Sequence, residues 1–192
     1  MNFMNKLTIA ALALAFLLPA LSSSAQSEAD MKAMMAYSTP GDIHKMLAGS
    51  VGAWSANITM WMEPGAPPST STAEAKNEMI LGGRYLQATN SGNFAGMPFE
   101  GIGITGYDNA KKMFVSTWID NMGTGIMYLT GTWDAASKTI NYTGSMVDPV
   151  SGKDIPVKEK LQIIDDKHQV MEMYSLAGGK EFKTMEIKMT MK

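Results

Sequence analysis

From Gly52 onward, the chain is a series of short β-type runs separated by turn signals. These signals are rich in Gly, Pro, Asn and Asp, the residues that tight turns favour, and they read EPGAPPS, LGGR, GNFAGMP, YDNAKK, DNMGTG, DAASK, DPVSGK, DDKH and AGGK. Nine breaks imply about ten strands of ordinary length. Connections this short join antiparallel neighbours, and so long a meander leaves bare edges unless it closes. The sequence therefore predicts an all-β fold, an antiparallel up-and-down β-barrel of about ten strands.

Residues 1–25 have the three parts of a secretory signal peptide. Lys6 precedes the apolar run LTIAALALAFLLPAL, and small residues follow up to Ala25. The run is shorter than the roughly 20 apolar residues of a membrane-spanning helix. No cysteine stands at the predicted cleavage point after Ala25, so the mature end is not that of a lipoprotein. We expect a periplasmic or secreted protein that is not membrane-anchored after cleavage.

The segment 26–51 is predicted to be helical and to precede a barrel domain over residues 52–192. Its first part, residues 28–37, places three methionines on one helical face: Met31, Met34 and Met35. This pattern predicts a short helix with one apolar side.

A second short helix is predicted from Thr39 to Leu47. Thr39 is a good N-cap, Pro40 suits the first helical position, and Gly49 ends the apolar stripe. We expect this helix to lie against an open end of the barrel as a lid or plug.

The composition limits both how the fold is stabilised and which partners it suits. The chain has no cysteine, so disulfides do not stabilise it. Its net charge is −2 and it has no basic cluster, which argues against nucleic acid or an anionic membrane as partner.

Alternation along the strands places each Met-x-Met pair on one face: Met60 with Met62, Met171 with Met173, and Met189 with Met191. Trp61 points to the other face. If the barrel closes, the first and last strands become neighbours and these faces meet inside it. The predicted ligand-binding residues are Trp54, which we assign to the barrel floor, and Ile58, Met60, Met171, Met173, Met185, Ile187 and Met189.

Glycine in one strand suggests a bare strip on the barrel wall. Gly101 and Gly103 alternate with Ile102 and Ile104. Glycine inside a strand weakens it unless a bend, an aromatic ring or a ligand needs close approach. A bare strip opposite flexible methionines would suit an apolar ligand of variable shape, although the same residues could fill a core.

Metal and haem chemistry are alternatives for an exported chain with 19 methionines. Thioethers suit Cu(I), but the chain has two histidines, His44 and His168, and Trp61 faces away from its neighbouring methionines. Haem needs a histidine inside the barrel, whereas both histidines fit solvated or capping positions better. Zinc is disfavoured for want of Cys and clustered His. We assign no metal and no cofactor.

An enzymatic site is difficult to assemble from this sequence. It has no Gly-x-Ser-x-Gly elbow, no Cys nucleophile and no His-Glu-x-x-His pair. Glu100 and Asp120 could form a carboxylate pair of a hydrolase if adjacent strands bring them together. Asp120 also heads a turn, where Asp bonds its own backbone. We assign no catalytic residue.

The stretch GAW, Gly52 to Trp54, opens the first strand after a short helix and resembles the Gly-x-Trp start of lipocalins and other calycins. That resemblance implies a tryptophan at the barrel floor, stacked against a basic residue of the last strand. Lys188 and Lys192 are the candidates for this partner.

A wider resemblance, from His44 to the end, is to a bacterial domain-of-unknown-function family, number fifteen seventy-nine. The stretches that carry it are HKMLAGSVGAW, LGGRYL, GMPFEGIGITGYD, STWIDNMGTG and DPVSGK. It implies a calycin-like barrel and a mostly secreted setting, and no established activity.

These observations favour an exported soluble barrel that binds a small hydrophobic molecule or lipid noncovalently. Three alternatives stay open: Cu(I) or haem binding through Met and His, a structural or protein-interaction role using outward residues such as Trp61, and a carboxylate-based hydrolase.

Overall fold

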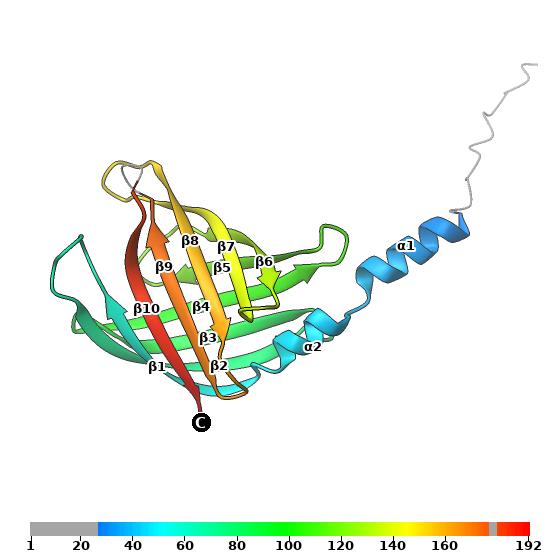
Figure 1. The fold of residues 1–192 in the computed structure, drawn as a ribbon, viewed down its shortest axis with the longest axis horizontal. Helices are drawn as coiled ribbons and strands as arrows, with labels where there is room; N and C mark the ends of the chain where they lie inside the picture. The colour runs from blue at the N-terminus through cyan, green and yellow to red at the C-terminus, as the bar shows by residue number, and fades with distance from the viewer. Residues whose placement is uncertain (1–26, 177–179) are drawn as a thin grey trace, which may run out of the picture.

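The computed structural model describes residues 27–176 and 180–192. The predicted signal peptide and its cleavage site lie outside the described residues. Ten antiparallel strands form a closed barrel in the order β1-β10-β9-β8-β7-β6-β5-β4-β3-β2 (Figure 1), which confirms the predicted architecture. The strands are β1 (Gly52–Met60), β2 (Ser69–Ile80), β3 (Tyr85–Phe94), β4 (Met97–Asp108), β5 (Met113–Asp120), β6 (Met127–Asp134), β7 (Thr139–Val147), β8 (Asp154–Ile163), β9 (His168–Ser175) and β10 (Phe182–Met191).

The barrel closes where β1 pairs with β10. The pairing runs from Trp54 opposite Met191 to Met60 opposite Met185, so it covers most of both strands. Because every strand has a neighbour on each side, no edge is left to pair with another chain.

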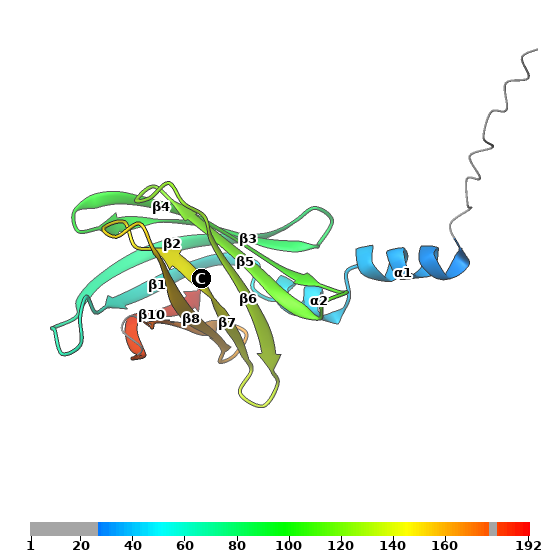
Figure 2. The same ribbon diagram turned by 90° about the horizontal axis from the view of Figure 1, so that it is seen from above.

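Helix α1 (Glu28–Ser38) extends away from the barrel, as the two views in Figures 1 and 2 show. Ser27 caps it through a reciprocal capping box with Asp30. None of its residues is buried, and the three methionines of the predicted apolar face, Met31, Met34 and Met35, are 51, 58 and 68 % exposed.

Helix α2 (Asp42–Ala48) begins three residues later than predicted. Thr39 is the C-cap of α1 instead of the N-cap of α2, because its backbone N–H and its hydroxyl both donate to the Met35 carbonyl. Gly41 is the N-cap, and its N–H donates to Nδ1 of His44 at 3.0 Å. The predicted N-cap at Thr39 is therefore wrong, because the hydrogen bonds of Thr39 end α1.

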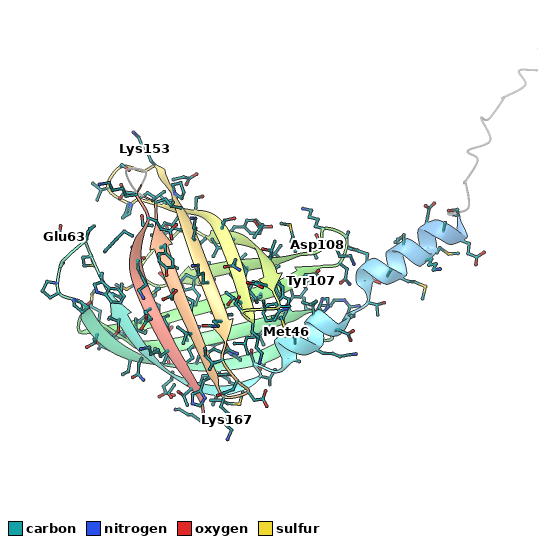
Figure 3. The ribbon with its side chains drawn as sticks, viewed as in Figure 1. Met46, Glu63, Tyr107, Asp108, Lys153 and Lys167 are labelled. Atoms are coloured by element: carbon teal, nitrogen blue, oxygen red, sulfur yellow. The ribbon has the colours of Figure 1, made fainter. Side chains whose placement is uncertain are left out.

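Helix α2 covers one end of the barrel. Its Leu47 is buried in the main apolar cluster, together with Phe114, Leu129, Ile140, Tyr142 and Val157. Figure 3 shows Met46 and Tyr107 at this end, whereas Glu63 and Lys153 lie in loops at the opposite end. We call these the closed end and the mouth.

The floor of the barrel is tied together around Ser50. The indole Nε1 of Trp54 and the amide of Asn77 both donate to the Ser50 carbonyl, at 2.9 and 3.1 Å. The buried Gln169 donates to the Ser50 hydroxyl at 2.8 Å. Trp54 is 1 % exposed. These bonds join β1, β2 and β9 to the end of α2, and Trp54 lies at the floor as predicted.

Among the described residues, no helix is long and apolar enough to cross a membrane.

Candidate functional site: the barrel lumen

The methionines of β1, β10 and β9 form one continuous inner wall. In successive strands Met60 is paired with Met185 and Met185 with Met173, while Ile58 is paired with Ile187 and Ile187 with Met171. Paired residues point to the same face of a sheet. The three methionine-bearing faces are therefore contiguous. The wall contains Ile58, Met60, Met171, Met173, Met185, Ile187 and Met189.

Met62 does not belong to this wall, which corrects one prediction. Strand β1 ends at Met60, and the Met62 side chain is 81 % exposed in the following loop. The last backbone hydrogen bond between this end of β1 and strand β10 is the one that the Trp61 N–H donates to the Thr184 carbonyl. The alternation of inward and outward side chains holds only as far as the strand stays hydrogen-bonded to its neighbours.

The inward side chains are unevenly covered. Every residue of the methionine wall is only partly buried, although all of them face inward. Trp54, Phe114 and Ile140 are fully buried toward the closed end, and Leu129 and Val157 are as deeply buried on β6 and β8. We call the space bounded by the strands the lumen, and its least covered wall is the one formed by β1, β9 and β10.

The glycine strip on β4 is not bare, which corrects a second prediction. The Trp118 ring of β5 lies against it: a Cβ on Gly101 would sit 2.4 Å from Trp118 Cζ2, and one on Gly103 would sit 3.4 Å from Cε3. The ring also stacks on Phe99 with 16° between the planes. The glycines thus accommodate an aromatic ring, one of the reasons for glycine in a strand.

Glu100 and Asp120 do not form a carboxylate pair. Asp120 is paired with Gly101 and shares its inward face, so the neighbouring Glu100 points outward, where it is exposed. Asp120 accepts hydrogen bonds from Trp118 Nε1 at 2.7 Å and from the Met122 N–H at 2.9 Å. Both carboxylate oxygens of Asp120 are therefore engaged, Oδ2 by the Trp118 indole and Oδ1 by the turn at Met122.

Glu159 of β8 is the inward carboxyl that the sequence analysis missed. Its pairing partners are Tyr142 on β7 and Met173 on β9, both of which face the lumen. Burial raises the pKa of Glu159 from 4.5 to about 7. The signal was present in DIPVKEKLQI, where Ile155, Val157, Glu159 and Leu161 alternate with polar residues. A charged residue in the apolar phase of a strand marks a candidate site.

The Tyr142 phenol, on the strand next to Glu159, is 2 % exposed. Burial, and then the nearby Glu159, raise the pKa of Tyr142, and a hydrogen bond with the Thr105 side chain opposes the rise. The phenol therefore stays neutral. The inward face of the barrel thus holds one carboxyl, that of Glu159, without a hydrogen bond or ion pair among the described residues.

Neither histidine lies on the inward face of a strand. His44 is 5 % exposed beneath Tyr107 and accepts from Gly41, and burial lowers its pKa first, with Arg84 adding to the effect. His44 therefore has the capping role that was one of its two predicted roles. The alternative, a solvated histidine, is wrong because the residue is buried. His168 is paired with Thr190 on the outward face and bonds Asp165. No cluster of three or more His, Asp or Glu suited to a metal ion occurs in residues 27–176 and 180–192.

Trp61 lies on the outer surface, as predicted. The Lys183 ammonium is 5.3 Å from the centre of its ring and also bonds Glu172 and Glu186. Lys188 and Lys192, the expected partners of Trp54, instead form ion pairs with Glu186 and Glu74. In the described part of the chain neither lies over Trp54, whose nitrogen the Ser50 carbonyl already binds. That implication of the calycin resemblance is wrong here.

A second concave feature lies on the outer wall. It is a hollow of about 610 Å³ between β6 and β7, lined by Ile126, Tyr128, Thr130, Thr143, Gly144, Ser145, Val147 and Asp154. It is separate from the lumen, because Tyr128 and Ser145 are paired on the outward phase of their strands.

A family model described as "Protein of unknown function (DUF1579)" matches residues 39–191. Among solved structures, Rv2717c from M. tuberculosis has a TM-score of 0.60 and 13% identity, over 80% of this chain and 99% of that one. The S-type phycobiliprotein lyase CPES from Guillardia theta has a TM-score of 0.55 and 6% identity, over 83% and 96%. Identities this low establish a likeness of fold. No curated protein matches the chain.

Proposed function

The chain belongs to the DUF1579 family, whose description assigns no activity, and we propose that it binds a small, mainly apolar molecule noncovalently in the barrel lumen. One observation carries the proposal: a continuous wall of methionine and isoleucine faces inward and is only partly buried. Covering this apolar surface with an apolar ligand is favourable, and the unbranched methionine side chain adapts to irregular ligand shapes.

The fold is compatible with this role. Barrels of eight or more strands are wide enough to hold a small ligand, and their mouths are common binding sites. One structural neighbour is named a phycobiliprotein lyase. We transfer no activity from it, since at 6% identity the likeness concerns the fold alone.

Native mass spectrometry of the protein purified from an exporting host, without reducing agent, tests the proposal directly. We expect added mass that is lost on organic extraction and that identifies the ligand. A bare mass from several hosts, together with no uptake of apolar dyes, would contradict the proposal.

A double substitution in the methionine wall provides a second test. Met60→Lys combined with Met173→Lys places two ammonium groups in the lumen, and we expect it to abolish binding of the uncharged dye N-phenyl-1-naphthylamine. The matched control is Met62→Lys with Met122→Lys, because both side chains are exposed, 81 % and 45 %. The control should bind the dye like the parent protein. Retained affinity in a folded Met60/Met173 double variant would contradict the lumen as the site.

Cu(I) binding is the second candidate, because Met60, Met185 and Met173 occupy one register row on three adjacent strands. Thioethers are soft ligands that Cu(I) accepts. A copper-sized mass increment that survives organic extraction and disappears in Met185→Leu would favour it over an apolar ligand.

A protein-interaction role predicts instead that outward residues matter. Trp61→Ser removes the aromatic surface under Lys183 and leaves the lumen unchanged. Under the lumen proposal this variant binds N-phenyl-1-naphthylamine like the parent protein.

We also propose that the protein acts in the periplasm or outside the cell, after cleavage behind Ala25. The support is the pattern of residues 1–25. N-terminal sequencing of the exported product should begin at Gln26, and an intact Met1 in the cell-free fraction would contradict export by this signal.

A further inference from the structure

We infer that the ligand of the lumen is an amphiphile with a basic nitrogen, whose cationic group binds the Glu159 carboxylate while its apolar part lies along the methionine wall. This inference rests on the proposed function and adds the chemical class of the ligand to it.

The charge inside the lumen has one sign. Following the strand pairing around the barrel, the inward faces of β1 to β10 carry two ionisable acids, Asp120 and Glu159. The inward positions of these ten described strands hold no Lys, Arg or His. A cation that enters the lumen therefore meets only opposite charge, whereas an anion is repelled.

Of the two acids, Glu159 is the one left for a ligand. Asp120 already accepts from the Trp118 indole and from the Met122 N–H. Glu159 has no ion pair and no hydrogen bond within the described residues, and it faces the lumen between Tyr142 and Met173. A buried carboxyl without a partner loses its hydration free energy and gains nothing in return. A ligand cation bound to it would compensate for that loss.

The lysines beside Glu159 cannot take this role. Lys158 and Lys160 alternate with it on β8 and therefore point outward. Lys158 forms an ion pair with Glu181, and Lys160 lies over the Tyr174 ring at 5.3 Å from its centre. On the adjacent strands the residues paired with Glu159 are Tyr142 and Met173, and neither carries a positive charge.

Tyr142, the residue paired with Glu159 on β7, leaves the carboxyl free for a ligand. Gly131 lets the Tyr142 ring lie over β6, on the side away from β8, because a Cβ there would be 2.6 Å from the ring. An ammonium group has three donors, so it can bind both oxygens of the Glu159 carboxylate.

The methionine wall begins next to Glu159. Met173 is paired with Glu159 on one side and with Met185 on the other, and Met60 follows. A ligand held at Glu159 by its nitrogen would therefore lay an alkyl chain across three methionines. The raised pKa of Glu159 agrees with this arrangement, since its cause is burial with no neighbouring cation to oppose it.

Competition between two matched probes tests the inference. The parent protein is loaded with N-phenyl-1-naphthylamine at pH 8 and titrated with decylamine or with 1-decanol, which differ only in the terminal group. We expect decylamine to displace the dye at a concentration at least about tenfold lower than 1-decanol does. The difference corresponds to one charge-assisted hydrogen bond. Glu159→Gln should remove this preference and keep dye and decanol binding. The exposed, outward Glu100→Gln is the control and should retain it.

Each outcome is decisive. Equal displacement by the two probes, with the dye bound, overturns the inference and leaves the proposed function standing. A preference that persists in Glu159→Gln overturns the role of Glu159. Absence of any dye, decanol or decylamine binding overturns the proposed function and this inference with it. If Glu159→Gln fails to fold, the parent protein supplies the test: the preference for decylamine should shrink from pH 8 to pH 5 as Glu159 is protonated, and an unchanged preference overturns the inference.

Discussion

The Trp118 indole nitrogen donates a 2.7 Å hydrogen bond to Asp120, two residues further along the inward face of β5. This bond turns the ring along its own strand and over Gly101 and Gly103 of β4. One interaction therefore accounts both for an inward carboxylate that could pass for a catalytic group and for glycines that could pass for a ligand-binding strip. It leaves Glu159, which faces inward from β8, as the acid without a partner.

Gly101→Ala should destabilise the protein, because the new methyl group would sit 2.4 Å from the Trp118 ring. Overpacking of this kind costs about 1–3 kcal/mol in free energy of unfolding. Urea denaturation followed by tryptophan fluorescence measures it. Gly123→Ala, where no atom lies within 4 Å, is the control and should change little. Equal stability of the two variants would mean that the ring moves freely.

Gln169→Leu should weaken the floor of the barrel. The buried amide donates to the Ser50 hydroxyl at 2.8 Å, and its loss leaves a buried polar group unpaired. We expect a loss of about 1–3 kcal/mol in urea denaturation. Gln162→Leu is the matched control, since this exposed glutamine donates to the Ser137 carbonyl at the surface. A Gln169 variant as stable as the control would contradict the structural role of the network.

Glu159 should make the stability of the protein depend on pH. Its pKa is raised from 4.5 to about 7 in the folded protein, so the folded state holds the proton more tightly than the unfolded chain. Stability therefore falls as the pH rises from about 4.5 to about 7, and the full cost of the ionised carboxyl is present above that range.

Glu159→Gln should remove this cost. We expect the variant to be more stable than the parent protein by about 1–3 kcal/mol at pH 8, and similar to it at pH 4.5, in denaturation curves measured at both values. Glu100→Gln should leave the difference between the two pH values unchanged. A constant offset between the Glu159→Gln and parent curves at every pH would show that the carboxyl does not titrate in this range.

Asn109→Ala should release helix α1 without affecting the barrel. The Asn109 amide donates to the carbonyls of Ala36, Tyr37 and Thr39, which end the helix. We expect faster cleavage by chymotrypsin after the exposed Tyr37, with the stability of the barrel within about 0.5 kcal/mol of the parent. Asn93→Ala, which affects only the β3–β4 turn, should not change the cleavage rate. Unchanged cleavage in the Asn109 variant would show that other contacts hold α1.

Local patterns in the sequence were enough to predict the strand count, the closed antiparallel barrel and the inward methionines. Turn residues and period-two alternation act over a few neighbouring positions, and closure follows from the need to pair both edges. Trp54, Met60 and Met173 could be assigned to the interior for that reason.

Other features depend on which segments meet in space. Met62 leaves the wall because β1 ends at Met60, Thr39 ends α1 because its hydroxyl meets the Met35 carbonyl, and the glycines of β4 face Trp118 because β5 is the next strand. The partners of Glu159 likewise come from β7 and β9. A one-dimensional pattern tells which side chains point inward. Whether an inward group finds a hydrogen bond, a counter-charge or open space depends on the side chains opposite it, and those come from distant parts of the chain.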